Sequence, residues 1–199
     1  MALIKLTEYG YGQLELNLVA FPRDGRVVAQ YKAGTTFTAD EVTGDDRYLE
    51  CGMLLKVDGA NRCVDKAGSE GPQPGEIYAL NYSTEHMYDE RVYRLADFRL
   101  NSVNDFYPRL GYLAIGDKFT TNCVCVEGTE GKTQKETAAA ALAAIEALAE
   151  SGTVYGGACD NGYIKLSNTL PTAGPALRVI QIYTMPDGQA AVKLEVIRG

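Results

Sequence analysis

"YTMPDGQAAVKLEVIRG", residues 183–199, is the stretch that decides the fold class. Pro186 presets φ for the first central position of a turn, and Gly188 supplies the positive φ that a bulged hairpin turn requires. Apolar and charged residues then alternate with period two: Val192, Leu194 and Val196 against Lys193 and Glu195. This alternation predicts a strand with one buried face, preceded by a tight turn.

The same turn chemistry recurs along the chain, as Asp24-Gly25, Asp58-Gly59 and Asn161-Gly162. Each pair lies between or beside short apolar or alternating segments, which is typical of β-hairpins. The further strands that we predict are 14–20, 26–32, 52–57, 61–65, 76–82, 92–100, 111–115, 119–126, 162–167 and 177–185. Their spacing predicts a mainly β fold, a sandwich or barrel of short antiparallel strands.

One helix interrupts this pattern, at about 134–150. Thr133 and Glu136 have the spacing of a capping box, and an alanine run of high helix propensity follows. A narrow apolar stripe is expected from Leu142, Ile145 and Leu148/Ala149, and Gly152 is expected to end the helix. We expect this helix to pack on one side of the β domain.

The chain divides in sequence into two parts. Residues 1–48 hold a hairpin around Asp24-Gly25 and then a polar stretch, which predicts an N-terminal arm. Residues 49–199 form the predicted main β domain with the inserted helix, and the Gly/Pro/Ser-rich segment 66–76 is expected to be an exposed loop.

The composition restricts the classes of function. The 199 residues carry a formal net charge of −7, and their basic residues are scattered, so a general nucleic-acid binder is not expected. Neither a signal peptide nor a membrane-spanning apolar stretch is predicted, and the five cysteines lack a disulfide framework, which favours synthesis in a reducing cytoplasm. The 13 tyrosines suit surfaces that become buried on assembly.

"RLGYLAIGDKFTTNCVCVEG", residues 109–128, invites the reading of a site. Period two across 119–126 would put Phe119, Cys123 and Cys125 on one face. Zinc needs four ligands, usually in C-x₂₋₄-C pairs or with histidines, and the chain has no C-x-x-C motif. We therefore expect both cysteines to be buried, reduced and unliganded.

Phosphate-binding motifs are incomplete. "GDKFTT" has one glycine and leads into β-branched residues, whereas a P-loop needs G-x-x-x-x-G-K-[ST] before a helix. The "GKT" at 131–133 does precede the predicted helix, but Val126 stands where the first glycine belongs. A loop that ends in the Thr133 cap is the simpler interpretation.

The candidate catalytic residues do not combine into a recognisable catalytic set. Asp45-Asp46 follows a glycine but reads as a solvated turn, and Asp89-Glu90 has arginines beside it, as in a surface ion-pair cluster. His86 is the only imidazole. The adjacent glycines in "VYGGACDNGY", 154–163, are assigned to a tight turn. We predict no catalytic, cofactor-binding or metal-binding residue, and a structural or binding role in place of an enzyme.

Several stretches resemble small head-associated structural proteins of tailed bacteriophages: "CGMLLKVDGANRCVDKAG", "GEIYALNYSTEHMYDERVYRLADFRL", "YPRLGYLAIGDKFTTNCV" and "PTAGPALRVIQIYTMPDGQAAVKLEVI". They cover about 51–128 and 171–197. The resemblance implies a non-enzymatic decoration, or cement, protein on the outer surface of the virion capsid. The resemblance also implies its partners, which would be the major capsid protein and copies of itself in a homo-oligomer such as a trimer, with no nucleic acid, membrane or cofactor. The longer chain leaves open a head fibre base, neck or tail protein, and a glycan- or ligand-binding β module is the remaining alternative.

Overall fold

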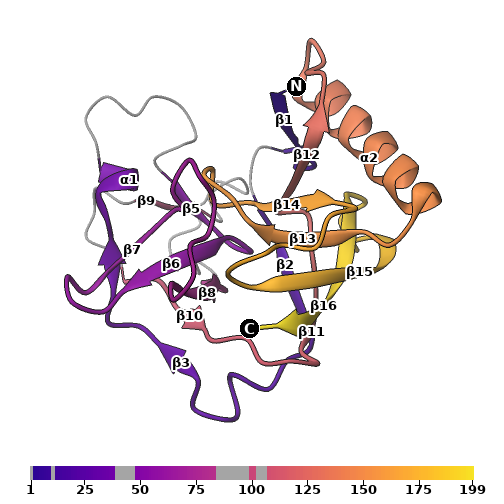
Figure 1. The fold of residues 1–199 in the computed structure, drawn as a ribbon. Helices are drawn as coiled ribbons and strands as arrows, with labels where there is room; N and C mark the ends of the chain where they lie inside the picture. Colours follow the sequence, from indigo (N-terminus) through magenta and orange to yellow (C-terminus); the bar gives the residue numbers. More distant parts are fainter. Residues whose placement is uncertain (1, 10–11, 39–47, 84–98, 102–106) are drawn as a thin grey trace.

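The computed structural model describes residues 2–9, 12–38, 48–83, 99–101 and 107–199. Within them the fold is mainly β, as predicted, with an eight-stranded, a six-stranded and a two-stranded sheet. One substantial helix, α2 (Gln134–Ser151), lies beside the largest sheet (Figure 1).

The eight-stranded sheet contains both the N-terminal and the C-terminal strand of the chain. In pairing order its strands are β1 (Ala2–Lys5), β12 (Val124–Gly128), β14 (Ile164–Ser167), β13 (Tyr155–Ala158), β15 (Ala176–Thr184), β16 (Ala190–Arg198), β11 (Lys118–Thr121) and β2 (Leu14–Leu18). All neighbours are antiparallel except β12 and β14.

This sheet has to curl. In a flat sheet, β12 and β11 would lie roughly 24 Å apart, five strand spacings. In sequence only Asn122 and Cys123 separate them, and three peptide units reach about 11 Å. The two strands can therefore meet only if the sheet bends round like a half-open barrel.

A smaller, six-stranded sheet packs beside it. Its pairing order is β3 (Val27–Val28), β10 (Leu110–Gly111), β8 (Ile77–Asn81), β6 (Leu54–Asp58), β7 (Cys63–Asp65) and β4 (Lys32–Ala33). The short helix α1 (Thr35–Thr38) follows β4, and β5 (Tyr48–Glu50) pairs with β9 (Arg99–Asn101). Strands from the predicted arm, 1–48, are thus hydrogen-bonded within both of the larger sheets, and do not stand apart from them.

The predicted helix is confirmed, and three of the four Asx-Gly pairs lie in hairpins, between β6 and β7, β13 and β14, and β15 and β16. The hairpin expected around Asp24-Gly25 is wrong, because β2 and β3 pair with strands of different sheets. In the β6–β7 turn the positive φ falls at Arg62 and not at Gly59. Gly25, Gly162 and Gly188 have positive φ, and the last of them closes the β15–β16 hairpin.

Helix α2 begins with the capping box of Thr133 and Glu136, and the Gly152 amide donates to the Leu148 carbonyl at its end. The helix contacts β12 and β1 through a stripe shifted slightly from the predicted one, with buried residues Ala138, Ala141 and Ile145.

Several assignments differ from the sequence prediction. The single strand expected over 26–32 is two short strands, β3 and β4, at opposite edges of the six-stranded sheet. Of the strand expected over 92–100, residues 92–98 lie outside the described residues. The single strand expected over 119–126 is two strands, β11 and β12, with a bend between them. The strand expected at 111–115 is only the two-residue β10. The turn expected at Gly156-Gly157 is wrong, because both glycines lie within β13, where a Cβ on Gly156 would come within 2.7 Å of Ile164 Cγ2.

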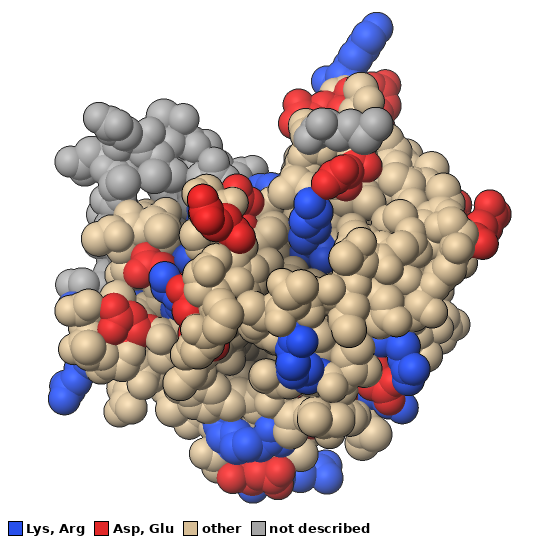
Figure 2. Space-filling view, viewed as in Figure 1, with Lys and Arg blue, Asp and Glu red and all other residues tan. Residues whose placement is uncertain are grey.

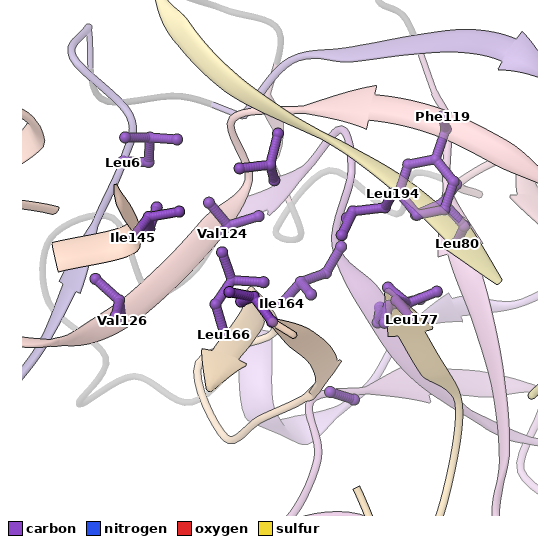
Figure 3. Close-up of a cluster of buried hydrophobic side chains, with 14 of the residues drawn as sticks. Leu6, Leu80, Phe119, Val124, Val126, Ile145, Ile164, Leu166, Leu177 and Leu194 are labelled. Atoms are coloured by element: carbon purple, nitrogen blue, oxygen red, sulfur yellow. The ribbon is translucent and has the colours of Figure 1, made fainter. Parts of the chain in front are cut away.

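Two clusters of buried side chains form the core. The larger one fills the curled sheet and the space under α2; Figure 3 shows Leu6, Val124, Val126, Ile145, Ile164 and Leu166 on one side of it and Leu80, Phe119, Leu177 and Leu194 on the other. The second joins the smaller sheet to β12 and includes Leu55, Val64, Cys123, Cys125 and Tyr163. Phe119 therefore belongs to a different cluster from the two cysteines, because the bend at Asn122 turns the chain over.

Candidate functional site

A cluster of polar side chains in the interior surrounds the carboxylate of Glu50, at the end of β5. Glu50 is fully buried. Its Oε2 accepts hydrogen bonds from the Tyr163 hydroxyl at 2.5 Å and from the Gly12 amide at 2.6 Å. Its carbonyl accepts from Asn81 Nδ2 at 2.9 Å. One glutamate thus connects three segments that lie far apart in the sequence.

Tyr163 supplies the opposite side of this cluster. Its ring is fully buried, and Lys5 Nζ lies 4.6 Å from the ring centroid, in a cation–π contact from β1. Burial raises the pKa of the Tyr163 phenol well above its ordinary value, and the nearby charge of Glu50 acts in the same direction. Tyr163 therefore remains a neutral hydrogen-bond donor to Glu50.

Three cysteines lie next to this pair. Cys123 is fully buried, and burial, aided by the charge of Glu50, raises the pKa of its thiol. Cys125 and Cys159 approach each other, with their sulfurs 3.6 Å apart. The predicted burial of Cys123 and Cys125 is confirmed; that they bind no metal stays a prediction. Within the described ranges, no three His, Cys, Asp or Glu side chains lie together as metal ligands would.

The Gly116-Asp117-Lys118 stretch is a turn organised by its aspartate. Asp117 is buried, and its carboxylate accepts from the amides of Ala114 at 2.8 Å and Ala20 at 3.0 Å. Arg26 Nη2 lies 3.6 Å from the same carboxylate. This aspartate therefore ties the N-terminal segment to the start of β11, a structural task.

The other candidate motifs separate into two groups. The "GKT" at 131–133 forms the N-cap of α2, as interpreted from the sequence, since the Thr133 side chain accepts from the Glu136 amide. Asp45-Asp46, His86 and Asp89-Glu90 lie outside the described residues.

The sequence predictions missed both Glu50 and Tyr163. The sequence does contain a signal for Glu50, which is the only charged residue in the otherwise apolar run from Leu49 to Leu55. A carboxylate within an apolar run is buried only when it has partners. The identity of the partner could not be found, because Tyr163 is 113 residues away in the chain.

The chemistry available to this cluster follows from its burial. Glu50, Tyr163 and Cys123 have no surface open to solvent, so a substrate cannot meet them without local unfolding. Their hydrogen bonds join β5, the Gly12 segment and the chain before β14. The arrangement stabilises the contact between β5 and the curled sheet, and the Asn81–Glu50 hydrogen bond connects this contact to β8 of the smaller sheet.

Raised thiol pKa values predict a loss of stability at alkaline pH. Burial raises the pKa of Cys51 to about 12 from 9.0. Between these two values the unfolded chain releases a proton that the folded chain retains. The stabilisation is therefore complete below about pH 9 and is lost as pH rises, by up to roughly 1.4 kcal/mol per pH unit for one group.

We expect urea unfolding under reductant to give a free energy of unfolding that falls between about pH 8.5 and 10.5, and falls less steeply in Cys51→Ala. Tyr163 contributes a fall of the same sign to both proteins, so the difference in slope isolates Cys51. Equal slopes would contradict the assignment.

Comparisons with protein-family models, with curated proteins and with solved structures each found no match to this chain. Among the helices that the structure describes, none has the length and apolar character needed to cross a membrane.

Proposed function

We propose that this chain is a non-enzymatic virion structural protein of a tailed bacteriophage, most simply a capsid decoration protein on the outer surface. Its partners would be the major capsid protein and further copies of itself. The sequence resemblance supplies the virion context. The buried carboxylates of Glu50 and Asp117 support a structural role. Glu50 accepts a hydrogen bond from the Gly12 amide, and Asp117 accepts from the amides of Ala20 and Ala114, so each carboxylate holds separate segments of the chain together.

The observation that carries the proposal is the edge of the large sheet. Within the described residues, β2 pairs with β11 on one side only. Leu16 and Leu18 of this strand are 40% and 66% exposed. An edge strand with exposed apolar side chains offers backbone hydrogen bonds and apolar area to a strand from a neighbouring subunit.

The sequence of β2 is compatible with a second copy of itself. If two β2 strands paired antiparallel with Leu16 opposite Leu16, Glu15 would face Asn17 of the other strand. No two carboxylates would then be opposed, which matters because like charges directly opposite destabilise a strand pair. On the face in Figure 2, acidic and basic side chains are interspersed among wide uncharged areas, which suits contact with other proteins.

Leu18→Glu is expected to weaken self-association without unfolding the chain. Leu18 is opposite Lys118 in the β2–β11 register, so in the monomer the new carboxylate lies near the Lys118 ammonium group. In the oligomer the same carboxylate would lie against the leucines of the neighbouring β2 strand, which disfavours association. Analytical ultracentrifugation should give an oligomer for the unmodified chain and at least a tenfold weaker association for the variant, about 1.4 kcal/mol.

Ile77→Glu is the matched control, because Ile77 is 59% exposed but lies on β8 of the other sheet. It should leave association unchanged. A monomeric unmodified chain, or equal effects of both variants, would refute the role of β2. The virion role is tested separately, by mass spectrometry of purified particles, in which this chain should be stoichiometric with the capsid; its absence would refute that role.

A groove beside α2 favours the second candidate, a ligand- or glycan-binding module. It has a volume of about 590 Å³ and lies between α2 and the ends of β12 and β14. Apolar walls from Leu148 and Leu166 face a polar rim that includes the Glu127–Lys165 ion pair at 2.8 Å. A glycan array with a specific hit that Lys165→Ala abolishes, from a chain that is monomeric, would favour this function over assembly.

A further inference from the structure

Cys125 and Cys159 are placed together by the strands on either side of β14. Cys125 of β12 and Gly157 of β13 are both opposite Lys165 of β14. The chain after β13 then turns over the start of β14, and this turn brings the Cys159 sulfur to 3.6 Å from that of Cys125. The two sulfurs are already in contact, although 34 residues separate them in sequence.

The surroundings of the pair distinguish the two thiols. Cys159 Sγ lies 2.8 Å from Asn161 Oδ1 and 3.3 Å from the Tyr163 carbonyl oxygen. Cys125 is fully buried, whereas Cys159 keeps 7% of its surface exposed. The hydrogen bond from Cys125 lowers the pKa of Cys159, so Cys159 is the more acidic and the more accessible of the two.

We propose that Cys125 and Cys159 are a redox-active dithiol that a hydroperoxide converts into an intramolecular disulfide, locking the crossover that contains α2. The inference stands on the geometry of the two thiols and does not depend on the virion role. It adds a covalent modification site to a protein that folds with all of its described cysteines free.

The reaction balances with hydrogen peroxide as the oxidant. The Cys159 thiolate attacks one peroxide oxygen, the O–O bond breaks, and the departing hydroxide takes up a proton and leaves as water. Cys159 is then a sulfenic acid. The Cys125 sulfur attacks the Cys159 sulfur, the S–O bond breaks, and the oxygen leaves as a second water with the Cys125 proton. Two thiols and one peroxide give one disulfide and two waters.

The cross-link would act on the crossover from β12 to β13. The segment between Cys125 and Cys159 includes all of α2, so the bond closes a loop around the only long helix among the described residues. Closing a loop of this size restricts the unfolded chain and stabilises the folded one. The protein would be made with free thiols in a reducing cytoplasm and would gain the bond on meeting an oxidising exterior.

The test uses the purified full-length chain, reduced, desalted and treated with hydrogen peroxide while folded. Thiol titration in denaturant should fall from five free cysteines to three, because one disulfide consumes two of the five. Non-reducing peptide mapping should join the peptides that contain Cys125 and Cys159. The melting temperature should rise by several degrees and return to its starting value on addition of dithiothreitol.

Variants separate this pair from the other cysteines. Cys125→Ala and Cys159→Ala should each abolish the loss of two thiols on oxidation and the reversible rise in melting temperature. Cys63→Ala, at a partly exposed thiol in β7, should retain both. If Cys125→Ala or Cys159→Ala fails to fold, peptide mapping of the oxidised unmodified chain still shows which two cysteines are joined. A bond between other cysteines, oxidation to sulfinic acid alone, or no loss of thiols in the folded chain would overturn the proposal.

Discussion

Glu50→Ala is expected to lower the free energy of unfolding by about 3–5 kcal/mol. The substitution leaves the Tyr163 hydroxyl and the Gly12 amide buried without their acceptor, and both are bonded to the same oxygen of Glu50. Each orphaned buried group costs roughly 1–3 kcal/mol. Urea unfolding at neutral pH measures the loss as a lower midpoint with an unchanged slope.

Matched variants identify the cause of this loss. Glu70→Ala removes an exposed glutamate and should change the free energy of unfolding by less than about 0.5 kcal/mol. Glu50→Gln retains one oxygen that can accept from both donors, so it should lose less than half as much as Glu50→Ala.

A double-mutant cycle with Tyr163→Phe measures the hydrogen bond itself. Since each single variant removes the same hydrogen bond, the double variant should lose at least 1 kcal/mol less than the sum of the two losses. Additive losses, or a Glu50→Ala effect as small as that of Glu70→Ala, would show that the Glu50–Tyr163 hydrogen bond does not stabilise the contact between β5 and the curled sheet.

Features set by neighbouring residues could be predicted from the sequence. The capping box of α2 needs only Thr133 and Glu136, and the β15–β16 hairpin needs only the turn around Gly188 and the alternation after it. In each case the residues that determine the structure lie within a few positions of one another. Propensity and capping therefore predict the outcome without knowledge of the rest of the fold.

The bend between β11 and β12 could not be predicted in this way. Thr121 Oγ1 accepts from the Cys123 amide locally, but it donates to the Gln13 carbonyl, 108 residues away. Asn122 accepts from the Gln13 amide and donates to Gln189. These partners come together only in the folded protein, so the alternation over 119–126 suggested one strand where tertiary contacts impose two.

The cluster around Glu50 could not be predicted from the sequence for the same reason. Its buried carboxylate, phenol and thiols come from β5, β12 and the chain before β14, and none of them forms a local motif. The sequence correctly predicted that Cys123 and Cys125 are buried. It could not predict that Cys159 would lie beside Cys125, because that contact depends on the pairing of β12 and β13 with a common strand.

Gly52 lies directly against the bend between β11 and β12, and Gly52→Ala is expected to cost about 2–5 kcal/mol of unfolding free energy. Gly52 has φ of +95°, which L side chains rarely adopt, and a Cβ there would lie 2.5 Å from Thr121 Oγ1 and 2.8 Å from Cys123 Cβ. The strained backbone accounts for roughly 1–2 kcal/mol, and forced repacking against the bend adds about 1–3 kcal/mol.

Gly116→Ala separates the two causes. Gly116 has nearly the same φ, +94°, but nothing lies within 4 Å of the Cβ that would be added. Its loss should be limited to the backbone contribution of about 1–2 kcal/mol. The difference between the two variants, measured by urea unfolding under identical conditions, is then the cost of displacing Thr121 and Cys123. Equal losses would mean that the bend tolerates a methyl group and that only the conformation at Gly52 is specified.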